Sequence, residues 1–90
     1  MSGIVPYIEQ KYAVRALLYI RDHPGCSIIE CMRAIRDSRT VYMRVREAIS
    51  LGLVTSEQGH TIHNRRNLFL SPTGQIVTSH ITAILKEMGA

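Results

Sequence analysis

Residues 38–51 constrain the fold most, because they predict an amphipathic helix with two contrasting faces. At the helical period its apolar residues share one face, which predicts packing against a core: Val41, Val45, Ala48 and Ile49. The opposite face carries guanidinium groups, a hydroxyl group and a flexible thioether. Ser38 is expected to be the N-cap of this helix, and Gly52 the C′ residue that follows its end.

The polar face of this helix has the chemistry that duplex DNA requires. Guanidinium groups bind phosphate oxygens and guanine edges, and a thioether can contact the methyl group of thymine. We therefore predict a DNA-recognition helix with these contact residues: Ser38, Arg39, Thr40, Tyr42, Met43, Arg44, Arg46 and Glu47. The alternative is an ordinary solvated helix face, because arginine is common on protein surfaces.

Positive charge is concentrated around the same helix. The chain carries a formal net charge of +4, and residues 33–66 account for all of it with seven arginines and three acidic residues. Such a patch favours a polyanionic partner, and Arg36 joins the expected DNA contacts because it lies just before the helix. A membrane surface would also attract the patch, but no basic amphipathic segment with aromatic anchors is present.

A shorter helix is predicted directly before the basic one. Ser27 and Glu30 have the spacing of a capping box, which opens a helix that extends to about residue 35. The side chains expected to face inward are those of Ile28, Met32 and Ile35, with Cys31 on an adjoining side. The next two residues form the turn into the basic helix. Two short helices joined in this way predict a helix-turn-helix unit over residues 27–51.

The N-terminal part of the chain predicts one long helix, from about residue 7 or 8 to residue 22, after a loose arm. A Pro-Gly pair then interrupts it. Its core stripe is formed by Ala13, Ala16, Leu17 and Ile20. Val14 and Leu18 form a second stripe, so the apolar surface is wider than one core face needs. The second stripe is therefore expected either to be buried within the domain or to contact a partner subunit.

A β-hairpin with a basic tip is predicted after the basic helix. Two segments with strand character, residues 53–57 and 67–70, flank a polar stretch. The returning side is expected to contact phosphates or the minor groove through His63, Asn64, Arg65 and Arg66. A solvated hairpin edge is the alternative for these residues.

A last helix is predicted over residues 72–88, because Ser71 is a good N-cap and Pro72 suits the first helical position. Its apolar residues recur at spacings of three and four and form one seam: Val77, Ile81, Ile84, Leu85 and Met88. A chain of 90 residues has a modest core, and a monomer would expose much of this seam. We expect a homodimer in which the seam, together with Val14 and Leu18, pairs across a two-fold axis.

Specific residues resemble those of winged helix-turn-helix regulators of bacteria and archaea, of the PadR-like and MarR-like kind. Residues 48–54 resemble the end of a recognition helix and the entry to the wing. Residues 65–74 resemble the returning wing strand and the opening of the next helix, although Asn64 stands where MarR-like proteins usually carry an acidic residue. The resemblance implies a homodimer on a roughly palindromic DNA site, with residues 38–51 in the major groove and the wing near the minor groove.

No catalytic, cofactor or metal site is predicted, and the chain is not expected to be an enzyme. No carboxylate pair, no nucleophile with a nearby base and no glycine-rich phosphate loop stands out. His23, Cys26 and Cys31 do not have the spacing of a zinc motif. The two cysteines are expected to be buried thiols, with an intersubunit disulfide as the alternative.

These features predict a single α+β domain, mostly α: a winged helix-turn-helix with a three-helix core, a two-stranded hairpin wing and a C-terminal helix. The expected function is sequence-specific binding of double-stranded DNA as a homodimer, in transcription regulation. No apolar run is long enough to span a bilayer and no signal peptide is visible, so a cytoplasmic location is expected. The alternative is a winged-helix module for protein–protein assembly, but such modules tend to show apolar or acidic groups where this helix shows arginine.

Overall fold

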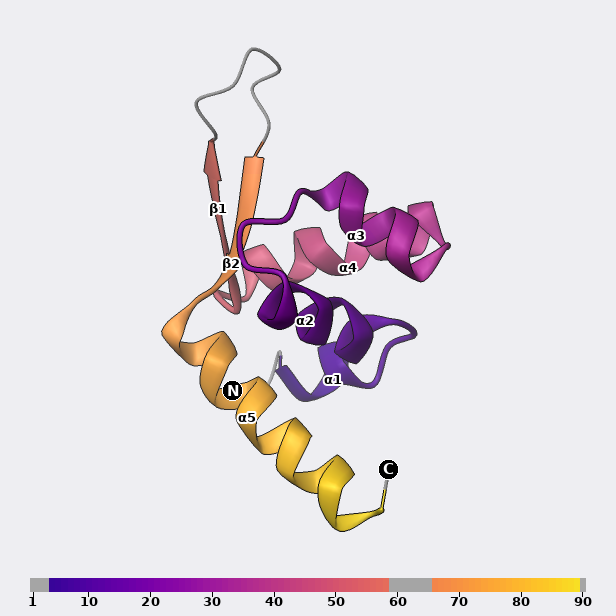
Figure 1. The fold of residues 1–90 in the computed structure, drawn as a ribbon, viewed down its shortest axis with the longest axis vertical. Helices are drawn as coiled ribbons and strands as arrows, with labels where there is room; N and C mark the ends of the chain where they lie inside the picture. The colour runs from indigo at the N-terminus through magenta and orange to yellow at the C-terminus, as the bar shows by residue number, and fades with distance from the viewer. Residues whose placement is uncertain (1–3, 59–65, 90) are drawn as a thin grey trace.

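The computed structural model describes residues 4–58 and 66–89 of the chain. In chain order the elements are α1 (Ile4–Ile8), α2 (Ala13–Asp22), α3 (Ile28–Ile35), α4 (Ser38–Ser50), β1 (Val54–Gln58), β2 (Arg66–Leu70) and α5 (Pro72–Glu87). Figure 1 shows α2, α3 and α4 packed together, with the two strands projecting from one end of the group and α5 leading away from it. The predicted fold class, helical with one two-stranded antiparallel sheet, is confirmed.

The core lies between α2, α4 and the two strands. The predicted inner stripe of α2 is fully buried: Ala13, Ala16, Leu17 and Ile20. The predicted inner face of α4 is buried as well: Val41, Val45 and Ala48, with Ile49 packed against the core. Leu53, Val54 and Leu68 complete the core from the strands and the segment before them. Each large apolar side chain removed from water contributes about 1.5–3 kcal/mol, so this contact dominates the stability of the fold.

The prediction of one long N-terminal helix is wrong, because α1 and α2 are separate helices joined by residues 9–12. Tyr12 ends this connection in the left-handed conformation, with a φ of 67°. In a continuous helix Tyr7 would lie roughly 130° around the axis from the core stripe of α2. The break lets Tyr7 turn back onto the core, where it is 2% exposed and its hydroxyl donates to the Arg44 carbonyl oxygen at 2.9 Å. Part of the arm predicted to be loose is also helical, since α1 begins at Ile4.

The helix α3 begins at the predicted capping box. The Ser27 hydroxyl oxygen accepts a hydrogen bond from the Glu30 N–H at 3.2 Å, and the Glu30 carboxylate accepts one from the Ser27 N–H at 3.4 Å. The most buried side chain of α3 is that of Cys31, which was predicted on an adjoining side. The side chains predicted to face inward are half-buried around it: Ile28, Met32 and Ile35. A short, apolar thiol suits the position at which a helix faces the core most directly.

The start of α4 differs from the prediction by one residue. Asp37, and not Ser38, is the N-cap, because its carboxylate accepts a hydrogen bond from the Thr40 N–H at 3.3 Å. A carboxylate at this position also interacts favourably with the positive end of the helix dipole. Arg36 precedes the cap in the left-handed conformation, with a φ of 65°. At the other end Gly52 has a φ of 77°, as predicted for a C′ residue.

The strands β1 and β2 pair in antiparallel register, with Val54 opposite Leu70. A further segment is attached to the base of this sheet, because Cys26 and Leu68 form an isolated bridge. The Leu68 N–H donates to the Cys26 carbonyl oxygen at 2.8 Å, and the Gly25 N–H donates to the Leu68 carbonyl oxygen at 2.8 Å. The connection between α2 and α3 therefore fastens the strands to the helical group.

The helix α5 begins as predicted, with Ser71 as N-cap and Pro72 at its first position. The Ser71 hydroxyl oxygen accepts a hydrogen bond from the Gly74 N–H at 3.0 Å, and the hydroxyl donates to the Gly52 carbonyl oxygen. The Ser71 N–H donates to the Leu53 carbonyl oxygen at 3.0 Å. These bonds fix the start of α5 against the end of α4. None of the described helices is both long enough and apolar enough to cross a membrane.

Candidate nucleic-acid interface

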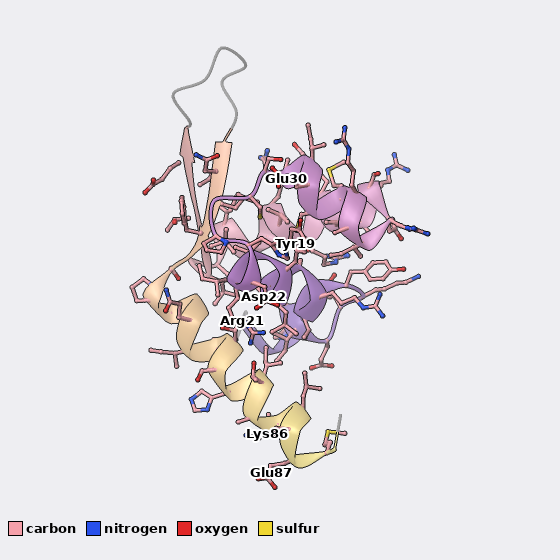
Figure 2. All side chains as sticks on the ribbon, viewed as in Figure 1. Tyr19, Arg21, Asp22, Glu30, Lys86 and Glu87 are labelled. Carbon is pink, nitrogen blue, oxygen red and sulfur yellow. The ribbon has the colours of Figure 1, made fainter. Side chains whose placement is uncertain are left out.

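The face of α4 that points away from the core carries basic and large apolar side chains. Arg39 and Arg46 are exposed, and Tyr42 and Met43 keep 43% and 49% of their surface accessible. Figure 2 shows nitrogen-tipped side chains gathered over α3, α4 and the adjoining end of α2. This surface combines positive charge with an aromatic ring and a thioether, so it suits a partner that is anionic and partly apolar.

Tyr42 and Arg46 form a pair one helical turn apart on this face. Arg46 Nη1 donates to the Tyr42 hydroxyl oxygen at 3.2 Å, and the guanidinium carbon Cζ lies 5.8 Å from the centre of the Tyr42 ring. A cation–π contact at an exposed site contributes about 0.5–1 kcal/mol. The ring therefore restricts the guanidinium group without neutralising it, and Arg46 keeps its charge and further N–H donors for a ligand.

The side chain of Arg44 lies differently from the prediction, which put it on the outward face. It is 11% exposed and forms an ion pair with the carboxylate of Glu47. Its Nε also donates to the Lys11 carbonyl oxygen at 3.2 Å, in the connection between α1 and α2. The helical period leaves Arg44 at the edge of the outward face, where a long side chain can turn toward either side. In this structure it ties α4 to the connection.

Further residues of the predicted set lie at the start of α4. Ser38 is exposed and Thr40 is half-buried. Arg36 is exposed beside the N-cap, and Arg33 on α3 adds another exposed guanidinium group. Positive side chains at this end of α4 accompany its N-terminal N–H groups, which together favour an anion.

The predicted contacts on the hairpin fall mainly outside the described residues: His63, Asn64 and Arg65. Arg66 is the first residue of β2, where it pairs with Gln58 of β1. In Figure 1 the two strands extend from the end of α4 that is opposite its N-terminus. Contacts from the hairpin tip therefore stay a prediction.

Comparison with known proteins gives a likeness in structure. Neither a family model nor a curated protein matches the sequence. MepR of Staphylococcus aureus, as a mutant bound to an oligodeoxyribonucleotide, has a TM-score of 0.79 at 20% identity, over 89% of this chain and 60% of that one. FabT of Streptococcus pneumoniae, in complex with DNA, has a TM-score of 0.78 at 12% identity, over 88% of this chain and 56% of that one. The chain has a winged-helix fold.

A third structure agrees, that of the transcriptional regulator SlyA, with a TM-score of 0.78 at 13% identity over 87% of this chain and 56% of that one. The chain thus spans well under two thirds of the length of these proteins. In the winged helix, α3 and α4 form the helix-turn-helix unit, and β1 and β2 form the wing. The likeness concerns the fold alone.

The apolar seam predicted on α5 divides into two parts. Val77 and Ile81 are half-buried beside the winged-helix core, as are Val14 and Leu18 on α2. The C-terminal part of the seam is exposed: Ile84 at 59%, Leu85 at 37% and Met88 at 75%. Figure 1 shows this half of α5 extending away from the other helices. Large apolar side chains gathered on one exposed helix end mark a surface that a partner could cover.

The two cysteines lie on either side of the α3 cap, and both are buried, as predicted. Burial, with a smaller effect of the nearby Cys26, raises the pKa of the Cys31 thiol to about 12. Such a thiol stays protonated and poorly reactive near neutral pH. Among residues 4–58 and 66–89 no three side chains of the metal-binding types gather at one point. His60 and His63 lie outside that part of the chain.

The connection between α1 and α2 carries a cationic group that was not predicted from the sequence. Lys11 and Arg15 both lie over the ring of Tyr12. The available signal was the spacing of four between two basic residues around an aromatic one. In the single long helix that was predicted, these residues would have formed an ordinary solvated face. Only the break between α1 and α2 brings them beside α4.

Replacing Arg44 by alanine is expected to destabilise the fold and leave DNA selectivity unchanged. The substitution removes hydrogen bonds of a charged group to Glu47 and Lys11, which should cost about 1.5 kcal/mol or more. Thermal unfolding measures the loss, and competition between a preferred and a random duplex measures selectivity. Arg46→Ala is the control, expected to lower selectivity with a smaller loss of melting temperature, because it removes only an exposed contact with Tyr42. Selective loss of the preferred duplex in Arg44→Ala would restore Arg44 to the base-contacting role first predicted.

Proposed function

We propose that this chain binds double-stranded DNA sequence-specifically as a homodimer and regulates transcription. The observation that carries the proposal is the exposed face of α4, which presents Arg39, Tyr42, Met43 and Arg46 at the recognition-helix position of a winged helix. Two of the structures it is similar to, those of MepR and FabT, contain DNA. The concentration of net positive charge in residues 33–66 supports the same partner.

In the proposed complex α4 lies in the major groove. Arg46, oriented by the Tyr42 ring, donates to a guanine edge, and Met43 contacts a thymine methyl group. Arg36 and Arg39 bind phosphates at the start of the helix, where the N–H groups of α4 add to the attraction. Arg65 and Arg66 extend the contact along the wing to the minor groove. These roles divide the interface into groups that select the sequence and groups that fix the register.

The dimer in this proposal pairs the exposed end of α5 with the same surface of a second copy. Ile84, Leu85 and Met88 would form the centre of that interface, with Ile81 beside them. Two-fold pairing sets two recognition helices about one DNA turn apart, roughly 34 Å, so the site is pseudo-palindromic. Such a protein works in the cytoplasm, with the chromosome.

Selection of sites from random duplex DNA, followed by fluorescence anisotropy, tests the proposal. The logarithm of the binding constant is expected to fall linearly with the logarithm of the salt concentration, steeply because arginines displace counterions. Arg39→Ala with Arg46→Ala should reduce the slope by roughly 1 per subunit, because Arg39 contacts a phosphate, and should abolish the preference for the selected site, because Arg46 contacts a base edge. Lys86→Ala, which removes one positive charge from α5, is the control and should change neither.

Failure to bind any duplex at low salt would contradict the proposal and favour the other reading of the fold, a protein–protein assembly module. Binding without sequence preference would contradict the part of it that concerns specificity. In that case the Arg39 and Arg46 variants would lower the affinity for all duplexes by similar factors.

A further inference from the structure

The connection between α1 and α2 holds two cations on one aromatic ring. The Lys11 ammonium nitrogen lies 5.0 Å from the centre of the Tyr12 ring, and the Arg15 guanidinium carbon lies 5.8 Å from it. Both basic side chains are exposed, while Tyr12 is half-buried and packed against the core. The ring therefore fixes the position of two like charges on the surface. We call Lys11, Tyr12 and Arg15 the turn cluster.

Among the described residues, no carboxylate forms an ion pair with the charges of the turn cluster. The ion pairs of Arg21 with Asp22 and of Arg44 with Glu47 include neither Lys11 nor Arg15. Two neighbouring cations repel each other, and an anion bound between them removes that cost. A charge-assisted hydrogen bond to a phosphate oxygen is the strong form of such a contact.

The turn cluster is attached to the recognition helix at a defined edge. Arg44 Nε donates to the carbonyl oxygen of Lys11 itself, and the Tyr7 hydroxyl donates to the carbonyl oxygen of Arg44. Around the axis of α4, Arg44 lies on one flank of the outward face, and Tyr42 and Arg46 lie toward the other. In Figure 1 the wing lies at the upper left and the connection lies at the right of the molecule. The turn cluster and the wing thus flank α4 from two different directions.

We propose that the turn cluster is a further DNA-backbone contact, in which Lys11 and Arg15 bind phosphates on the flank of the major groove opposite the wing. This inference rests on the proposed function. A helix in the major groove lies between two phosphate backbones, because the groove is about 12 Å wide. The turn cluster, which lies at the Arg44 edge of α4, would contact one of these two phosphate backbones. The contact adds affinity and orientation and carries no sequence information.

Arg44 has a positioning role in this arrangement. Its bond to Lys11 holds the backbone of the connection against α4, so the two cations keep a constant place relative to the recognition helix. Glu47 neutralises Arg44, which leaves Lys11 and Arg15 as the charges presented on this flank. The half-buried ion pair of Arg44 and Glu47 therefore stabilises the position of the connection, and the exposed Lys11 and Arg15 bind the DNA phosphates.

The test compares two pairs of charge-removing variants in the full chain. Lys11→Gln with Arg15→Gln keeps much of each side-chain stem and removes the turn-cluster charges. Arg21→Gln with Lys86→Gln removes the same number and types of charge on the α5 side of the molecule, as Figure 2 shows. Lys11→Arg with Arg15→Lys keeps both charges and checks that charge is the cause. Anisotropy titrations against a selected and a random duplex, over a range of salt, give affinities and slopes.

The turn-cluster variant is expected to bind both duplexes about tenfold more weakly and to lose roughly 2 from the salt slope per subunit. The charge-retaining swap and the α5-side variant should bind like the wild type. Wild-type affinity and slope in the turn-cluster variant, with intact DNA binding, would overturn this inference and leave the proposed function standing. An equal loss in the α5-side variant would overturn it too, since the effect would then belong to net charge. Failure of the wild type to bind DNA would remove both.

Loss of folding is checked by circular dichroism before each titration. If the double variant is unfolded, the single variants Lys11→Gln and Arg15→Gln carry the test, because both side chains are exposed. Each should then reduce the slope by roughly 1 per subunit, and unchanged slopes in both would overturn the inference.

Discussion

Gly74→Ala is expected to unfold the domain at temperatures at which the wild type is stable. A Cβ atom at this position would lie 2.0 Å from the carbonyl oxygen of Leu53 and 3.0 Å from its carbonyl carbon. Both are backbone atoms, so the joint between α4, β1 and α5 must open to admit the methyl group. A cost above ~3 kcal/mol is expected, which lowers the melting temperature by roughly 12 °C or more in a domain of this size.

Gly52→Ala is the control for this prediction. Its Cβ would meet no atom within 4 Å, so only the left-handed backbone, with a φ of 77°, opposes the change. That strain costs about 1 kcal/mol. Thermal unfolding followed by circular dichroism compares the two variants. Equal melting temperatures for them would mean that α5 does not approach Leu53 as closely as the structure has it.

Ile84→Glu with Met88→Glu is expected to give a folded monomer that binds its DNA site roughly 100-fold more weakly or worse, because two half-sites are no longer engaged together. Both side chains are more than half exposed in the single chain, so two carboxylates there cost the monomer little. In a dimer interface the same carboxylates would be buried without partners, which is strongly unfavourable. Light scattering measures the mass, and anisotropy measures the affinity.

Ser79→Glu with Ala83→Glu is the matched control, since it adds the same charge to exposed positions on another side of α5. It should stay dimeric. A wild-type chain that scatters as a folded monomer at micromolar concentration would remove the dimer from the proposed function. The exposed apolar end of α5 would then need another partner.

The sequence predicted those elements whose signals are local. The capping box of Ser27 and Glu30, the N-cap at Ser71 and the C′ glycine at Gly52 each depend on a few neighbouring residues, and each is present. The buried faces of α2 and α4 followed from periodicity alone, because one face of a helix must meet the core. The predicted N-cap of α4 was wrong by one residue, because Asp37 beside Ser38 also carries a short side chain that can accept a hydrogen bond from the first turn.

The break between α1 and α2 could not be predicted from local signals. Residues 9–12 contain neither proline nor glycine, and Tyr12 takes a conformation that is uncommon for an aromatic residue. The cause is a distant contact, the burial of Tyr7 against α4 with its hydroxyl bonded to Arg44. The orientation of Arg44 depends on the same contact. Because the break between α1 and α2 was not predicted, the side chain of Arg44 was also predicted on the wrong side of α4.

The hydrogen bonds at Ser71 fix the direction in which α5 leaves the end of α4. Its N-cap bonds to Gly52 and Leu53 leave little freedom between the end of α4 and the start of α5. A helix of 16 residues is about 24 Å long. A change of roughly 10° at the joint would shift its far end by about 4 Å, which exceeds the rise of one base pair, about 3.4 Å. In the proposed dimer the geometry of this joint therefore determines the distance between the two recognition helices. Substitutions at the small residues of the joint would change the spacing between half-sites that the dimer binds.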